Sequence, residues 1–258
     1  MTSILLEPRD RVAYLTINRP DALNAIDEDV LTEFAENLNR VSADTSIKAL
    51  VITGAGDAFC VGLDIDLLSR AFSDLDYFRR ILDRFKQLLL AVEALPVPVV
   101  VAVNGLARAG GFELILACDL VVISEAARIG DTHLAFGIVP GGGSTQRLPR
   151  RIGSQRAREL ILTGRWMSAS EAAEAGLALT AVEPQDLPAA VEELADRFRL
   201  LSRPCLAATK SAMRLGADLP LEKALELELD EFMRYLEQEP TSREGYLAYV
   251  EGRNPSWP

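Results

Sequence analysis

The stretch PVVVAVNGLARAGGFELILACDLVVI, residues 98–123, decides the fold. Residues 98–105 begin with an apolar run that is typical of a buried strand, and residues 120–123 form a second such run. Between them, Gly110-Gly111 leads into Phe112-Glu113, which indicates a short helix through Glu113. A strand, a helix and a further strand in immediate succession predict an α/β core.

The same alternation extends toward the N-terminus. Residues 11–18 alternate as a half-buried strand does, and Pro20 follows its end. Asp27 can then cap a helix in which Val30, Leu31, Phe34 and Leu38 recur at helical spacing. Residues 48–54 are typical of a buried strand, and residues 75–94 are typical of a helix that leads into the strand at residue 98.

The chain becomes mainly helical after Arg147. Two segments, Ser168 to Glu171 and Thr241 to Glu244, match the capping box, in which a glutamate reaches back to the N-cap N–H. From about residue 187 to the end the pattern predicts helices, with apolar residues at spacings of four, four and three: Leu221, Leu225, Leu229 and Phe232.

Composition excludes several classes of protein. The 258 residues are 49% hydrophobic, which is ample for a core, and the net charge of −11 opposes binding to nucleic acid or to an anionic membrane. Cys60, Cys118 and Cys205 are far apart and lack metal-binding spacing, so we expect reduced thiols and no metal site. With no leader-like start and no apolar run near the roughly 20 residues that a membrane span needs, we expect a soluble cytoplasmic protein.

Three glycine-bearing segments follow predicted strands. They are residues 59–64 (the first glycine loop), residues 108–113 (the second) and residues 136–143 (the third). Glycine lets a ligand approach backbone N–H groups closely, and the first turn of a helix leaves such groups unpaired. Two converging N–H groups form an oxyanion hole, and the loss of one donor typically costs about 2.7–4 kcal/mol of transition-state stabilisation.

His133 is the only histidine in the chain, and it lies between Glu113 and the third glycine loop. Histidine titrates nearest neutrality, and it can give or take a proton there. An imidazole and a carboxylate next to glycine-rich backbone favour acid/base chemistry on a substrate whose oxygen becomes negatively charged.

Four motifs in register resemble those of the crotonase (enoyl-CoA hydratase/isomerase) superfamily. They are Asn18 to Ala25, the first glycine loop, residues 104–119 and residues 138–148. The resemblance covers nearly the whole chain. It implies an α/β, crotonase-like fold of repeated ββα units with a C-terminal helical trimerisation region. Residues 1–195 would form the core with the acyl-CoA site, and residues 196–258 would form the region for oligomerisation and closure of the CoA site.

The resemblance also implies the substrate and the site residues. The substrate would be an acyl-CoA thioester, so coenzyme A enters as part of it, and the assembly would be a homotrimer or a dimer of trimers. The N–H groups of Leu63 and Gly110 would hold the thioester oxygen, and Glu113 matches the first catalytic glutamate of the hydratases. The expected CoA-groove residues include several around the first loop: Ala22, Ala25, Leu63, Asp64 and Ile65.

His133 stands where the hydratases keep a second glutamate, which is the main departure from the family pattern. Hydration of an enoyl thioester remains the favoured reaction, with Glu113 and His133 as the acid/base pair, and a nearby Glu113 would raise the pKa of His133. Isomerases of the family use one glutamate, and its C–C bond hydrolases use histidine. Those hydrolases carry a further histidine and an aspartate where this chain has Gly110 and Gly142. A non-catalytic acyl-CoA-binding homologue is the alternative from another class.

Two further regions resemble substrate-contacting parts of the family. Near the C-terminus, Tyr249 takes the place of an aromatic residue that packs against CoA. Gly252 stands where a lysine is expected, with Arg253 beside it as a substitute. Residues 69–83 correspond to the segment that shapes the acyl pocket, and their aromatic residues (Phe72, Tyr77 and Phe78) fit either that pocket or the core.

Overall fold

The computed structural model describes residues 2–257, which form a six-stranded and a four-stranded sheet. The strands of the larger sheet, in spatial order, are β1 (Ile4–Arg9), β2 (Val12–Ile17), β3 (Ala49–Gly54), β5 (Val99–Val103), β7 (Leu120–Ser124) and β10 (Thr180–Val182). Those of the smaller sheet are β4 (Ala58–Cys60), β6 (Leu106–Arg108), β8 (Arg128–Gly130) and β9 (Met167–Ser168). Only the β1–β2 and β8–β9 pairs within these sheets are antiparallel.

The helices lie between and after these strands. The α-helices up to residue 174 are α1 (Glu28–Ala43), α2 (Ile65–Ser73), α3 (Leu75–Ala94), α4 (Gly110–Ala117), α5 (Ser144–Ile152), α6 (Ser154–Thr163) and α7 (Ala169–Glu174). Those that follow are α8 (Leu187–Arg199), α9 (Arg203–Gly216), α10 (Leu221–Gln238) and α11 (Glu244–Glu251). Short 3-10 turns occupy η1 (Pro20–Ala22), η2 (His133–Phe136) and η3 (Pro184–Asp186).

Successive strands enter different sheets, and this gives the repeated ββα unit that the sequence resemblance predicted. Each of β3, β5 and β7 in the larger sheet is followed directly by a strand of the smaller sheet: β4, β6 and β8. The predicted strands and the helix at residues 75–94 are also present. The predicted α/β fold of repeated ββα units is therefore confirmed.

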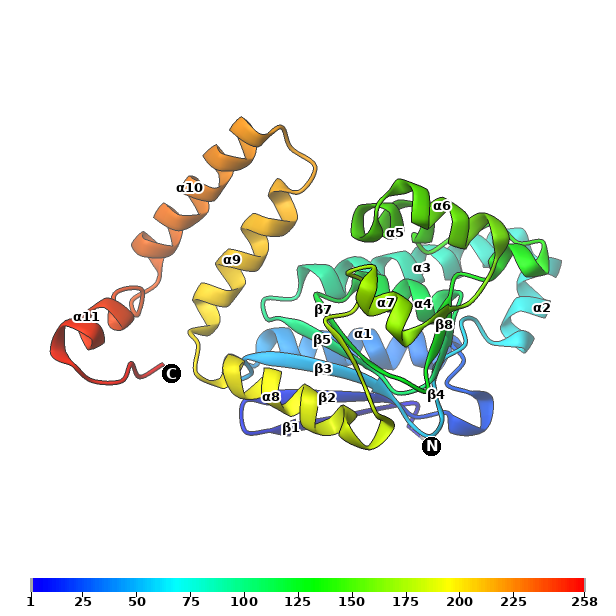
Figure 1. Ribbon diagram of the computed structural model, residues 1–258, viewed down its shortest axis with the longest axis horizontal. Helices are drawn as coiled ribbons and strands as arrows, with labels where there is room; N and C mark the ends of the chain where they lie inside the picture. The colour runs from blue at the N-terminus through cyan, green and yellow to red at the C-terminus, as the bar shows by residue number, and fades with distance from the viewer. Residues whose placement is uncertain (1, 258) are drawn as a thin grey trace.

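Helices cover both faces of the larger sheet, so its central strands are largely apolar. In Figure 1, α8 lies along one face, and α1, α3 and α4 lie on the other. Every residue of β5 is buried. Val51 and Val100 pack with Val191 of α8, whereas Ile52 and Val101 belong to the cluster on the opposite face. Such two-sided burial is typical of parallel sheets and explains the continuous valine run.

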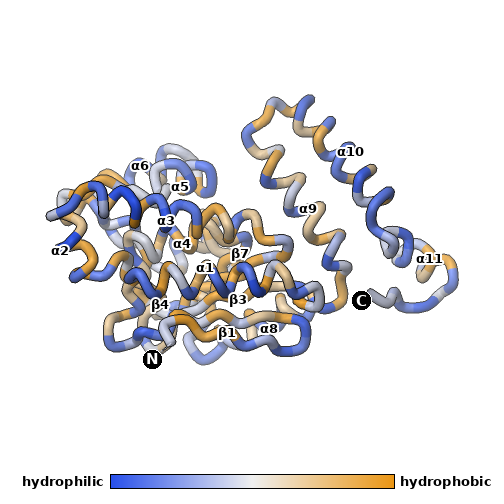
Figure 2. Tube along the Cα trace, turned by 180° about the vertical axis from the view of Figure 1, so that it is seen from behind, coloured by the Kyte–Doolittle hydropathy of each residue, from blue (hydrophilic) through white to orange (hydrophobic). Residues whose placement is uncertain are grey.

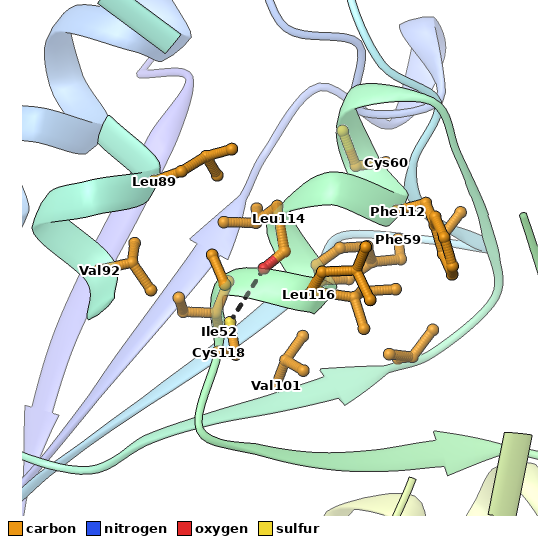
Figure 3. Packing of buried hydrophobic residues seen from close by; sticks show 14 of the residues in the cluster. Ile52, Phe59, Cys60, Leu89, Val92, Val101, Phe112, Leu114, Leu116 and Cys118 are labelled. Atoms are coloured by element: carbon orange, nitrogen blue, oxygen red, sulfur yellow. Dashed lines mark hydrogen bonds between the residues drawn. The ribbon is translucent and has the colours of Figure 1, made fainter. Parts of the chain in front are cut away.

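Helix α4 lies at the centre of the core, and every one of its residues is buried. Figure 3 shows its apolar side chains packed among those of α3 and the two sheets, including Phe112, Leu114, Leu116, Ile52, Phe59, Leu89, Val92 and Val101. The Cys118 thiol at its end donates to the Leu114 carbonyl over 3.3 Å. Cys60, Cys118 and Cys205 form no disulfide within the described residues. A helix held on all sides provides a rigid support for Glu113, which it carries.

The C-terminal helices α9, α10 and α11, here called the arm, extend away from the sheets (Figure 1). Helices α9 and α10 pack on each other, and Lys210 of α9 ties the arm to the core through Asp119, at a distance of 2.6 Å. The predicted boundary at residue 195 falls within α8, which continues to Arg199. Figure 2 shows apolar and polar residues interleaved along the arm. The arm therefore exposes many of its apolar residues.

The two predicted capping boxes have different outcomes. Ser168 and Glu171 form one at the start of α7, as expected. The prediction for Thr241 and Glu244 is wrong, because α11 begins at Glu244 itself and its N-cap, Arg243, makes no side-chain cap. Glu244 instead accepts hydrogen bonds from Arg253 and from the Ser256 N–H. No helix within residues 2–257 is long and apolar enough to cross a membrane.

Candidate active site

The first and second glycine loops meet at Gly62 and Gly110. Strands β4 and β6 pair in parallel, so the loops that follow them leave the same edge of the smaller sheet. A Cβ atom added to Gly62 would lie 3.0 Å from the Gly110 nitrogen, and Gly62 has a φ of 91° that favours glycine. Within the described structure, the N–H groups of Leu63 and Gly110 have no hydrogen-bond acceptor. The sequence-predicted oxyanion donors are therefore adjacent and unpaired.

Ala109 holds Gly110 in place through a strained backbone. Its φ of 47° and ψ of −121° lie in a region that L-residues rarely adopt. The Ala109 N–H donates to the carbonyls of Gly130 (3.2 Å) and Asp131 (3.1 Å), at the end of β8. The second glycine loop is thus fixed to the turn that precedes His133.

The Glu113 carboxylate is buried on α4 and is held by one oxygen. Its Oε1 accepts the N–H groups of Gly142, over 2.8 Å, and Ser144, over 3.1 Å. A Cβ on Gly142 would lie only 2.3 Å from Glu113 Oε2, so the third glycine loop needs glycine at this position. Oε2 has no partner in the described structure and is not among its buried unpaired atoms, so this oxygen stays accessible. An accessible oxygen on a fixed carboxylate can take a proton from a bound molecule.

His133 lies in η2, with one ring nitrogen against a buried carboxylate. Its Nδ1 is buried and lies 3.1 Å from Asp131 Oδ2, an ion-pair distance without a directed hydrogen bond. Its Nε2 has no partner in the part of the chain described and is not a buried unpaired atom. The accessible nitrogen of the only histidine is therefore Nε2.

The pKa values of Glu113 and His133 are both raised. Burial raises the pKa of Glu113 above 4.5, although the charge of His133 and the two N–H donors act in the opposite direction. Burial lowers the pKa of His133, but the contact with Asp131 and the charge of Glu113 outweigh it and bring the pKa above 6.5. The expected upward shift by Glu113 is confirmed in direction, with Asp131 as the larger raising influence. Perturbed pKa values of a neighbouring carboxyl and imidazole are typical of acid/base sites.

The predicted CoA-groove residues before Tyr249 gather around the first glycine loop. Ile26 pairs with Leu63, and its carbonyl accepts the Asp64 N–H over 2.9 Å. Arg19 donates to the Ala25 carbonyl over 2.6 Å and to the Asp64 carboxylate over 3.1 Å. Ala22 ends η1, beside these residues, and Ile65 begins α2 with 74% of its surface exposed.

Within one chain, Tyr249 and Arg253 lie far from the other predicted site residues. Helix α11, which carries Tyr249, is at the opposite end of the molecule from α2 (Figure 1). Tyr249 is 85% exposed. Arg253 forms ion pairs with Glu244 and Glu251, which raise the pKa of its guanidinium, and Arg253 lowers the pKa of Glu244 to about 2. Two carboxylates already neutralise the charge of Arg253.

The aromatic residues of the predicted acyl-pocket segment separate into two groups. Tyr77 is buried and its hydroxyl donates to Glu28 over 2.7 Å, so it belongs to the core. Phe72 and Phe78 meet edge to face, with ring centroids 5.5 Å apart, and Phe72 is largely exposed. These two rings lie where α2 meets α3.

Known proteins resemble this chain over its whole length. A family model described as enoyl-CoA hydratase/isomerase matches residues 7–258. The chain belongs to the enoyl-CoA hydratase/isomerase family. Among its relatives is a crotonyl-CoA hydratase from Syntrophomonas wolfei, 33% identical over 99% of this chain and 97% of the relative. A 2,3-dehydroadipyl-CoA hydratase from Escherichia coli is 34% identical over 100% and 99% of the two chains.

Solved structures agree with this membership of the enoyl-CoA hydratase/isomerase family. An enoyl-CoA hydratase from Bacillus anthracis superposes with a TM-score of 0.93 at 33% identity, over 99% of this chain and 98% of that chain. One from Mycobacterium smegmatis gives a TM-score of 0.92 at 30% identity, over 99% and 98%. The α/β crotonase fold is therefore shown. Residues 2–257 contain no group of three His, Cys, Asp or Glu side chains that could hold a metal ion.

Several residues that shape the candidate site were not predicted from the sequence. Asp131 was not singled out, although its place two residues before the only histidine was a usable signal. The N–H groups of Gly142 and Ser144, which hold Glu113, were also missed. Backbone donors leave no side-chain signature, and only the glycine run marks their position.

Proposed function

We propose that this protein hydrates 2-enoyl-CoA thioesters. The observation that carries the proposal is the state of Glu113: one carboxylate oxygen accepts two backbone N–H groups and the other is free. The unpaired N–H groups of Leu63 and Gly110 lie in the first and second glycine loops. This arrangement supports the addition of water to a substrate whose thioester oxygen is held as an enolate.

In the proposed reaction, Glu113 and His133 divide the proton transfers. The thioester oxygen accepts the Leu63 and Gly110 N–H groups. Glu113 Oε2 takes a proton from water while the water oxygen bonds to the β-carbon and the double-bond electrons move onto the thioester oxygen. Protonated His133 then gives its Nε2 proton to the α-carbon. Exchange with solvent removes the proton from Glu113 and restores that of His133, so the net change is the addition of one water.

CoA binding and assembly form a second part of the proposal. The CoA portion would lie against Ala22, Ala25 and residues 63–65, and these contacts would be largely backbone and apolar. The apolar residues of α10 would pack in a homotrimer or a dimer of trimers. Tyr249, which is remote from the site of its own chain, would then contact CoA in a neighbouring subunit, with Arg253 beside it.

A panel of 2-enoyl-CoA thioesters of increasing chain length tests the proposal. We expect loss of the conjugated-enoyl absorbance and formation of a 3-hydroxyacyl-CoA. If no thioester of the panel reacts at micromolar enzyme, the hydratase proposal is wrong. Supplying a 3-enoyl-CoA tests the isomerase alternative, since that activity would give the 2-enoyl product. Calorimetry with a saturated acyl-CoA identifies a binding protein by tight association without turnover of any unsaturated thioester.

The pairing of His133 with Asp131 favours hydrolysis of a C–C bond as the second candidate. The resemblance to the family's hydrolases rests on an active-site histidine, and an adjacent carboxylate supports such a role. Incubation with a β-diketone substrate separates the two functions. Cleavage into an acid and a ketone, with no hydration of the enoyl panel, would favour the hydrolase.

A further inference from the structure

The Asp131 carboxylate makes two contacts with His133. Oδ1 accepts the His133 main-chain N–H over 3.3 Å, and Oδ2 lies 3.1 Å from Nδ1 of the ring. The Asp131 side chain is fully buried, and Oδ2 has no other partner in the described structure. A buried carboxylate without a compensating partner is costly, and Nδ1 of His133, itself buried and without a hydrogen-bond partner, is the polar atom that lies against Oδ2.

The backbone around Asp131 brings these two side chains together. Thr132, between them, has a φ of 52°, a left-handed conformation that β-branched residues rarely adopt. This turn lets residues two apart in sequence face each other. The Asp131 carbonyl also accepts the Ala109 N–H, directly before Gly110. Asp131 therefore connects the histidine to the second glycine loop through its backbone and its carboxylate.

We propose that Asp131 is a positioning residue that keeps Nδ1 of His133 protonated and directs Nε2 toward the site. The tautomer of a histidine is set by the hydrogen bond of its other nitrogen, and a carboxylate at Nδ1 selects the Nδ1–H form. After Nε2 gives up its proton, the neutral ring keeps its N–H on Nδ1. This inference deepens the proposed function, since the role of Nε2 as proton donor rests on it.

The charged side chains near the His133 ring and its turn come from three parts of the chain. Glu113 faces it from α4, and Asp131 lies between β8 and η2. Arg108 of β6 stacks over the Phe136 ring at the other end of η2, at 5.3 Å. Of these, Asp131 alone contacts a ring nitrogen, so its removal is the change that reports on the tautomer.

The single histidine makes the test direct. In tag-free full-length protein labelled with ¹⁵N-histidine, every imidazole signal in a two-dimensional NMR spectrum belongs to His133. We expect the neutral wild-type ring to be the Nδ1–H tautomer, with a pKa above 6.5. In Asp131→Asn the pKa should fall and the Nε2–H tautomer should appear. Asp196→Asn removes an exposed aspartate on α8 and should change neither.

A wild-type ring that is predominantly the Nε2–H tautomer would overturn the inference, whether or not the Asp131 variant folds. An unchanged pKa and tautomer in a folded Asp131→Asn protein would also overturn it. These measurements need no substrate. A chain that fails to hydrate any enoyl-CoA therefore contradicts the proposed function, while the tautomer still decides the role of Asp131.

Discussion

Glu113, Asp131, His133 and the backbone that holds them, here called the wall of the site, differ from the C-terminal arm. The polar groups of the wall find partners within one chain, whereas many apolar side chains of the arm do not. In the wall, the buried Glu113 accepts two N–H groups, and the buried Asp131 meets His133. In the arm, α9 contains no buried residue, and α10 has the exposed apolar residues Leu221, Leu225, Leu229, Phe232 and Met233. The candidate acid/base groups are therefore brought together within a single chain, whereas the arm exposes apolar side chains.

Among the substitutions that affect the site and not the arm, we expect Glu113→Gln to reduce turnover most. The amide cannot take a proton from water, so we expect kcat on a 2-enoyl-CoA to fall by about 10²–10⁴-fold. Melting temperature and oligomeric mass should be unchanged. Glu174→Gln, an exposed glutamate at the end of α7, is the matched control. Undiminished turnover by Glu113→Gln would remove Glu113 from the mechanism.

The converse experiment changes the surface of the arm and leaves the wall of the site unaltered. Leu229 is 59% exposed on α10, and an aspartate there would place a charge in the proposed subunit interface. We expect Leu229→Asp to reduce the mass measured by analytical ultracentrifugation from that of a trimer or hexamer to that of a monomer. Glu228→Gln, next to it on the same helix, should keep the wild-type mass. A wild-type protein that is already monomeric would contradict the assembly proposal.

Gly142→Ala tests how closely the wall is packed. The added Cβ would meet Glu113 Oε2 at 2.3 Å and the Phe85 ring at 2.5 Å. We expect a loss of about 1–3 kcal/mol in the free energy of unfolding, together with reduced turnover. Gly141→Ala is the control, because its Cβ would make only an ordinary contact with Leu82 at 3.4 Å. Equal denaturation midpoints for the two variants would mean that the third glycine loop shifts to accommodate the added Cβ atom, so that the wall is not closely packed there.

The smallest effect concerns the strain at Ala109. Glycine tolerates a φ of 47° with a ψ of −121°, so Ala109→Gly should raise the free energy of unfolding by about 1 kcal/mol. For a chain of this size that corresponds to roughly 2–4 °C in melting temperature. Ala189→Gly, in the first turn of α8, should destabilise by a similar amount. A lower melting temperature for Ala109→Gly would show that Ala109 is not strained.

The sequence predicted the long elements and failed on the short ones. Strands β3, β5 and β7 and helix α3 have enough apolar residues in a row to show their periodicity. The strands of the smaller sheet follow only from the family resemblance and not from periodicity, because β4, β6 and β8 have three residues each, too few for a pattern. The capping box at Thr241 failed because Arg253 and Ser256, distant in sequence, take Glu244.

The candidate site was predictable where a side chain or a glycine marks it. The family register located Glu113, His133 and the two glycine loops, and the structure places Gly62 against Gly110. Asp131 was not found, because its contact with His133 depends on the left-handed Thr132 between them. Tyr249 and Arg253 are predicted by register alone, and the role proposed for them requires a neighbouring subunit.

The central claim is that Glu113 acts as the base and His133 as the acid. The pH–rate profiles of the wild type and of His133→Gln on a reactive 2-enoyl-CoA test it most directly. We expect a bell-shaped profile for the wild type. Activity falls at low pH as Glu113, with its pKa raised above 4.5, becomes protonated, and at high pH as His133, with its pKa raised above 6.5, loses its proton. In His133→Gln the alkaline limb should vanish while the acid limb remains. An alkaline limb unchanged in that variant would contradict the account.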